Sequence, residues 1–89
     1  MIERETEIVN RLGLHARAAA KLVHTAGGFQ SRITLSKDGE EVDAKSILGL
    51  LLLAAGQGSR VMVRCNGDDE EAAVEAVTRL IASRFEEES

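Results

Sequence analysis

The order in which strand-like and helix-like spacing follow one another constrains the fold of this chain most. Apolar residues alternate with polar ones in some segments and recur every three or four positions in others. The strand-like segments are residues 2–9, 31–36, 40–44 and 60–65, and the helix-like segments are residues 16–26, residues 47–55 and a final one starting at Asp68 or Asp69. This βαββαβα order predicts an α+β open-faced sandwich, in which three helices cover one face of a four-stranded antiparallel sheet.

Glycine-containing turns separate these segments. Gly27-Gly28 ends the first helix, Asp38-Gly39 is typical of a hairpin between two strands, and Asn66-Gly67 closes the last strand. The final helix is expected to pack through an apolar stripe made by Val74, Val77, Leu80, Ile81 and Phe85. Glu86 to Glu88 oppose the helix dipole, so we expect the helix to fray there and the acidic tail to be solvated.

Length and composition exclude several classes of protein. Eighty-nine residues make one domain, residues 1–89, whose core must be aliphatic because Phe29 and Phe85 are the only aromatic residues. A net charge of -4 argues against nucleic-acid binding. The longest apolar run, residues 47–55, falls short of the roughly 20 residues that span a bilayer, so no membrane insertion is expected.

Cysteine and histidine usage points to the cytoplasm and to a protein without cofactors. A single cysteine, Cys65, forms no intramolecular disulfide, and His15 and His24 supply no metal-ligand cluster. The N-terminus is charged from the start and lacks the apolar segment of a secretory signal. We therefore expect no metal, no cofactor and a cytoplasmic location.

The stretch Gly13-Leu14-His15-Ala16-Arg17-Ala18-Ala19-Ala20 places a histidine where an alanine-rich helix begins. Ala16 has no side-chain oxygen to cap the helix. The first backbone N–H groups are therefore expected to be available to bind an anion, namely those of Ala16, Arg17 and Ala18. An ordinary imidazole has a pKa of about 6.5 and is largely neutral and nucleophilic near neutral pH. With the charge of Arg17 beside it, His15 is predicted to be a phosphohistidine site.

This window resembles the active-site signature of HPr, the histidine-containing phosphocarrier family of the bacterial phosphotransferase system. A second window, Asp43-Ala44-Lys45-Ser46-Ile47-Leu48-Gly49-Leu50, is similar to the family's second signature, at the family's own distance from His15. The resemblance covers essentially the whole chain and implies the same sandwich fold. It implies phosphorylation of His15 on Nδ1, phosphate contacts from Arg17, and a regulatory kinase acting on Ser46. Ala18 replaces the proline usual in the family, which should alter the helix entry slightly.

The apolar helix after Ser46 predicts a partner-binding surface. Leu50 and Leu53 can face the sheet. Another face is shared by Ile47, Leu48 and Leu51, and some of this apolar surface is expected to be exposed. In the family this helix and the His15 helix form one docking surface. The expected partner-binding residues are Ala20, Lys21, His24, Ile47, Leu48 and Leu51.

The resemblance implies a monomeric phosphoryl carrier and not a turnover enzyme. His15 would accept the group from Enzyme I, charged by phosphoenolpyruvate, and pass it to IIA proteins. An HPr kinase/phosphorylase and a transcriptional regulator are further implied partners through Ser46. Two alternatives remain: a carrier of the nitrogen-related branch with a regulatory IIA acceptor, and a mainly regulatory module acting through phosphorylated Ser46. A small hydrolase using His15 ranks last, because the chain offers no base, metal or cleft for it.

Overall fold

A computed structural model describes residues 1–88 and confirms the expected order of elements. The element bounds differ from the expected ones by a few residues at most, as is usual for frayed ends. The elements are β1 (Ile2–Glu7), α1 (Ala16–Gly27), β2 (Arg32–Lys37), β3 (Glu40–Asp43), α2 (Ile47–Leu53), β4 (Arg60–Asn66), α3 (Glu70–Ala82) and a short 3₁₀ segment, η1 (Arg84–Glu86).

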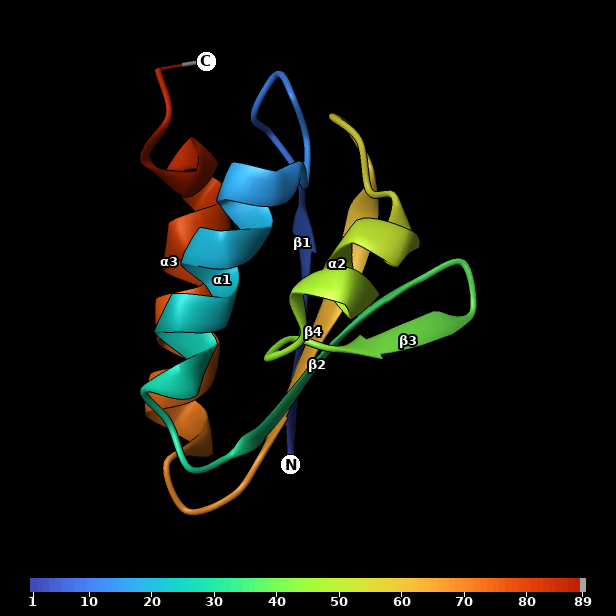
Figure 1. Ribbon diagram of the computed structural model, residues 1–89. Helices are drawn as coiled ribbons and strands as arrows, with labels where there is room; N and C mark the ends of the chain where they lie inside the picture. The colour runs from blue at the N-terminus through green and yellow to red at the C-terminus, as the bar shows by residue number, and fades with distance from the viewer. Residues whose placement is uncertain (89) are drawn as a thin grey trace.

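The four strands form one antiparallel sheet in the order β1-β4-β2-β3, and the helices lie on one of its faces (Figure 1). The alternation of β4 shows why only one face is covered: Val61, Val63 and Cys65 point inward and are buried. Arg64 points outward, where it contacts Glu3 of β1 and, at 2.9 Å, Glu41 of β3. The uncovered face is thus held by charged pairs across the strands.

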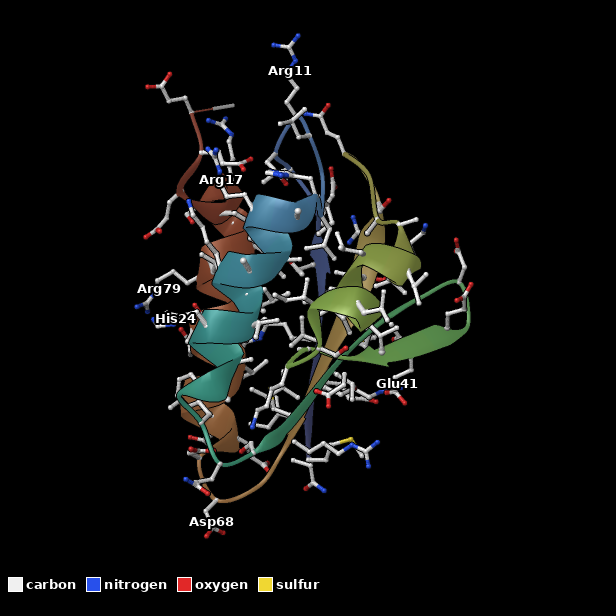
Figure 2. The ribbon with its side chains drawn as sticks, viewed as in Figure 1. Arg11, Arg17, His24, Glu41, Asp68 and Arg79 are labelled. Atoms are coloured by element: carbon white, nitrogen blue, oxygen red, sulfur yellow. The ribbon has the colours of Figure 1, made fainter. Side chains whose placement is uncertain are left out.

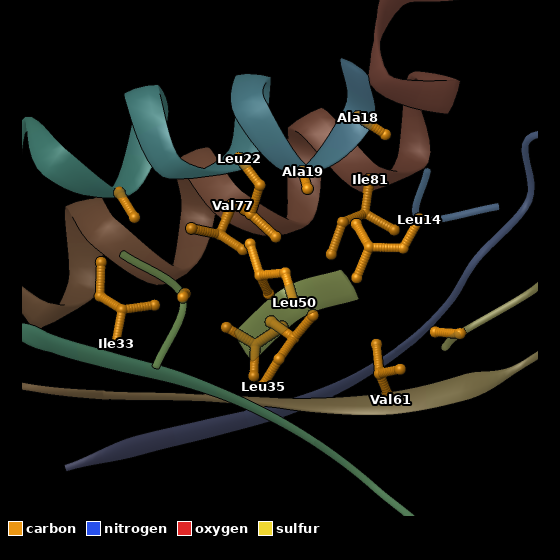
Figure 3. Packing of buried hydrophobic residues seen from close by; sticks show 14 of the residues in the cluster. Leu14, Ala18, Ala19, Leu22, Ile33, Leu35, Leu50, Val61, Val77 and Ile81 are labelled. Atoms are coloured by element: carbon orange, nitrogen blue, oxygen red, sulfur yellow. The ribbon is translucent and has the colours of Figure 1, made fainter. Parts of the chain in front are cut away.

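The core between sheet and helices is aliphatic except for one phenyl ring, as the composition predicts. Ile33, Leu35 and Val61 of the sheet meet the inner sides of the helices in Figure 3. The helical contribution to this cluster is made by Ala18, Ala19, Leu22, Ala26, Leu50, Leu53, Ala73, Val74, Val77 and Ile81. Within residues 1–88, no helix is both long and apolar enough to cross a membrane.

The chain after α3 corrects one expectation. The helix ends at Ala82, and Arg84, Phe85 and Glu86 adopt φ angles of 60°, 54° and 62°, in the left-handed region. Phe85 packs in the core as expected, but from this left-handed turn and not from the helix. The buried Phe85 ring and the left-handed turn bring the chain back onto the domain, so the tail is ordered against it, although Glu86 and Glu88 are exposed to solvent as expected. The tail approaches the N-terminus of α1 (Figure 1).

Candidate functional site

His15 lies at the N-terminus of α1 and caps it. Its backbone is extended, with φ -80° and ψ 179°, and its Nδ1 accepts the backbone N–H of Arg17 at 3.3 Å. A turn at Gly13, with φ 68°, precedes it and is joined to the rest of the fold by the Leu14 N–H, which donates to the Ala55 carbonyl at 2.9 Å. The side chain of His15 is 27% exposed. The imidazole is therefore fixed in place and open to the surface on one side.

The structure refines the expected set of free N–H groups. His15, not Ala16, is the capping residue, and its ring already occupies the N–H of Arg17 with one long hydrogen bond. Ala16 and Arg17 are exposed, whereas Ala18 is fully buried. In this conformation an anion can approach the exposed residue Ala16, while the Arg17 N–H is engaged by the ring and the Ala18 N–H lies beneath the surface.

The other ring nitrogen of His15 faces the C-terminal tail. Its Nε2 makes a short contact with Oε2 of Glu87, whose Oε1 accepts from Nδ2 of Asn10 at 3.0 Å. Asn10 is fully buried and also donates to the Gly13 carbonyl at 2.7 Å. Burial raises the pKa of Glu87, but hydrogen bonds from Asn10 and His15, with the charges of His15 and Lys21, hold that pKa below its usual value. Glu87 is therefore an ionised carboxylate against the histidine ring.

Lys21 holds the tail in this position. Its Nζ donates to the carbonyl of Phe85 at 2.7 Å. The resulting depression is lined by Leu12, His15, Ala16, Arg17, Lys21 and Glu86 to Glu88. Figure 2 shows Arg17 at the start of α1, beside the C-terminal segment. Arg17 and His15 thus line the same open depression.

Sequence reasoning missed Asn10 and Glu87. The contact between His15 and Glu87 joins residues 72 positions apart, so no local spacing marks it. The signal available was Phe85, an apolar residue within the final acidic stretch, whose burial requires that the tail fold back.

Ser46 caps α2, with its Oγ accepting from the Gly49 N–H at 3.1 Å. This is the role that its position before an apolar helix predicts. α2 lies beside α1 (Figure 1), so Ser46 and His15 stand at the starts of neighbouring helices.

The large apolar side chains of α2 divide into two faces as expected. Leu50 and Leu53 are buried. The exposed ones are Ile47, Leu48, Leu51 and Leu52, of which Leu48 and Leu52 are exposed by 68% and 69%. We call these four residues the α2 patch. Only Leu52 was absent from the expected partner-binding set.

The expected partner-binding residues of α1 lie elsewhere. Ala20 and His24 are exposed, and with Lys21 they line a groove that also includes Leu80 of α3. Figure 2 shows His24 on the side of α1 turned away from α2. The structure therefore does not join Lys21 and His24 to the α2 patch.

A half-buried histidine that caps the first helix of an open-faced βαββαβα sandwich defines the class of small phosphoryl-carrier domains. Within residues 1–88 no group of three or more His, Cys, Asp or Glu side chains could hold a metal ion. The His15 ring beside the exposed N-terminus of α1 offers nucleophilic and anion-binding chemistry.

Comparison with known proteins identifies the family. Residues 2–83 match the family model described as the PTS HPr component phosphorylation site. The chain is 53% identical to phosphocarrier protein HPr of Cupriavidus necator over 98% of both chains. It is 41% identical to phosphocarrier protein NPr of Shewanella violacea over 99% of this chain and 97% of that one. A crystal structure of HPr from Thermoanaerobacter tengcongensis superposes with a TM-score of 0.96 at 48% identity, covering 100% of both chains. The chain belongs to the HPr family, whose members are phosphocarriers and not catalysts.

Proposed function

We propose that this chain accepts a phosphoryl group on Nδ1 of His15 from Enzyme I of the bacterial phosphotransferase system and passes it to IIA proteins. The observation that carries the proposal is the orientation of the ring. Nδ1 faces the N-terminus of α1 within an open depression, whereas Nε2 is occupied by Glu87. Nδ1 is thus the nitrogen beside which an anion gains from the helix dipole.

The chemistry requires positioning more than proton transfer. Phosphoryl transfer passes through a loose transition state with charge on the peripheral oxygens, which N–H donors and a guanidinium stabilise. The exposed N-terminus of α1 supplies the N–H groups of Ala16 and Arg17, and the Arg17 side chain lines the same depression. The buried N–H of Ala18 takes part only after the covering atoms move.

Two exposed surfaces suit the docking of partners. The α2 patch is apolar and lies on the helix next to α1, an arrangement typical of the centre of a protein interface. A separate groove, which we call the α1 groove, is lined by Ala20, Lys21 and His24. The Lys21 side chain already donates a hydrogen bond to the C-terminal tail. We assign the α2 patch to the docking of Enzyme I and the IIA proteins, and the α1 groove to a second, separate contact with the same partners.

Ser46 is the proposed regulatory site. Phosphorylation there adds about -1.5 to -2 charges at the start of α2, where negative charge is locally favourable. The fold should be retained, and the effect should fall on partners that contact the adjacent α2 patch. An HPr kinase/phosphorylase would add this group, and a transcriptional regulator would recognise it.

Labelling with phosphoenolpyruvate and Enzyme I tests the site. We expect the wild-type chain to gain one phosphoryl group in intact-mass spectra and to lose it in acid, because a phosphoramidate is acid-labile. His15→Ala should abolish this labelling and leave kinase-dependent, acid-stable labelling at Ser46. Ser46→Ala should have the reverse effect. Retained Enzyme I labelling in His15→Ala would refute the assignment.

The acceptor separates the sugar and nitrogen branches. The higher identity to an HPr than to an NPr, 53% against 41%, supports the sugar branch. Labelled protein should therefore pass its phosphoryl group faster to a sugar-specific IIA domain than to a nitrogen-related one from the same bacterium. Faster transfer to the nitrogen-related acceptor would favour the alternative. If the chain transferred its phosphoryl group to neither acceptor and only the Ser46-phosphorylated chain bound a partner, the result would support a mainly regulatory module.

A further inference from the structure

The contacts around the His15 ring assign its proton. A neutral imidazole has one N–H donor and one lone-pair acceptor. Nδ1 faces the N–H of Arg17 and must accept, whereas Nε2 faces the carboxylate of Glu87 and must donate. Both contacts are satisfied by the same tautomer, the one with its proton on Nε2. That tautomer leaves the lone pair on the nitrogen nearer the helix N-terminus.

A second contact fixes the carboxylate itself. Asn10 donates to the other oxygen of Glu87 at 3.0 Å and is anchored to the Gly13 carbonyl at 2.7 Å. Glu87 therefore receives a donor on each oxygen, one from a fully buried side chain and one from the ring. Its side chain is only 14% exposed, which limits competition from water.

The backbone of the tail is held in an unfavourable conformation to bring Glu87 there. Each of the three residues of η1 has a positive φ, a conformation that is unfavourable for a residue with a Cβ. Burial of the Phe85 ring and the Lys21 hydrogen bond to its carbonyl hold the turn. Strain of this kind persists only where surrounding contacts determine it, and it is concentrated at functional sites.

We propose that Glu87 is a positioning residue that keeps the proton of neutral His15 on Nε2 and pairs the positive charge that the ring gains when Nδ1 takes a phosphoryl group. This inference rests on the proposed function of His15 and adds to it a role for the C-terminal tail. The residue acts through the ring and does not touch the phosphoryl group.

The step balances without an added acid or base. The Arg17 N–H first releases the Nδ1 lone pair. This lone pair forms the new N–P bond as the bond from phosphorus to the donor breaks, and the electron pair of that bond leaves with the donor. The Nε2 proton stays on the ring, whose added positive charge lies against the Glu87 carboxylate, as a triad carboxylate stabilises its imidazolium. Transfer to an acceptor reverses the step and restores the neutral ring with its proton on Nε2.

Long-range ¹H–¹⁵N spectra of His15 test the tautomer directly, without any phosphoryl transfer. When the wild-type ring is neutral, we expect it to be almost entirely in the Nε2–H form. Glu87→Ala should give a mixture in which the Nδ1–H form is readily detected. Glu87→Gln preserves the shape of the side chain but leaves one acceptor oxygen for two donors, the Asn10 amide and the His15 Nε2–H. It should therefore also raise the population of the Nδ1–H form. Glu71→Gln removes the same charge from an exposed residue of α3 that does not line the His15 depression, and should match the wild type.

The rate of labelling by Enzyme I is the second measurement. Glu87→Ala and Glu87→Gln should be labelled about tenfold more slowly than wild type and Glu71→Gln. Wild-type tautomer populations in Glu87→Gln, or a shifted tautomer with an unchanged labelling rate, would overturn the proposal. Failure of the wild-type chain to be labelled would instead refute the proposed function, while the spectra would still report on Glu87.

Discussion

Gly13 shows how a missing side chain determines where His15 lies. Its φ of 68° is left-handed, and a Cβ added there would lie 2.8 Å from both the Ala55 carbonyl oxygen and the Cα of Gly56. The Gly13 carbonyl also accepts from the side chain of Asn10 and from the His15 N–H. The turn therefore packs directly on the segment after α2, and its hydrogen bond to the His15 N–H fixes the position of the histidine.

Gly13→Ala should be strongly destabilising. The left-handed conformation and the backbone clash together should lower the free energy of unfolding by about 2–4 kcal/mol, measured in urea. Gly39→Ala is the matched control, since Gly39 has a φ of 85° but nothing within 4 Å of an added Cβ. It should lose only about 1–2 kcal/mol. Equal losses in the two variants would show that the close packing at Gly13 is unimportant.

The two faces of α2 have different roles: the buried face stabilises the fold, and the exposed face is proposed to bind partners. Leu50→Ala removes a fully buried side chain and should lower the free energy of unfolding by about 2–5 kcal/mol. Leu52→Ala changes an exposed one and should lower it by less than about 0.5 kcal/mol. The second variant should nevertheless bind Enzyme I more weakly in titration calorimetry. Unchanged binding would remove Leu52 from the docking surface.

The start of α3 is tied to the loop after α1 through Asp69. Its carboxylate accepts from the Ser31 hydroxyl at 2.5 Å and from the backbone N–H groups of Gln30 and Ser31 at 2.8 and 2.9 Å. These bonds, first that of the Ser31 hydroxyl and then that of Gln30, lower the pKa of Asp69 below its ordinary value. The carboxylate thus links two elements that are distant in the sequence.

This link predicts a pH dependence of stability. Because the folded pKa is lowered, the contribution of Asp69 is fully present above the ordinary Asp value of about 3.9 and is lost as the pH falls through the lowered folded value. Asp69→Asn should therefore be less stable than wild type at neutral pH, and the difference in thermal midpoint should shrink on acidification through that window. Asp68→Asn, a neighbouring charge change at an exposed residue, should show no such convergence. A difference that stays constant with pH would contradict the assignment.

Across the whole molecule, local patterns predicted the elements, and long-range contacts determined the details of the site. The alternation in β4 and the two faces of α2 were readable because strand and helix spacing are set by neighbours. His15 could be proposed as the site from the sequence because its signal, a histidine before an alanine-rich helix, is also local. Glu87 was not, because its place depends on a left-handed turn that only the burial of Phe85 explains.

The same dependence makes the C-terminus a structural part of the domain. Ending the chain after Ser83 removes Phe85, which is fully buried, and should lower the free energy of unfolding by about 3 kcal/mol or more. Ending it after Glu86 keeps the ring and removes the Glu87 hydrogen bonds to Asn10 and His15. That loss should be only about 1 kcal/mol. Urea unfolding of both shortened chains measures the difference. If the two losses were equal, the phenyl ring would not anchor the tail, and Glu87 would reach His15 by its own contacts alone.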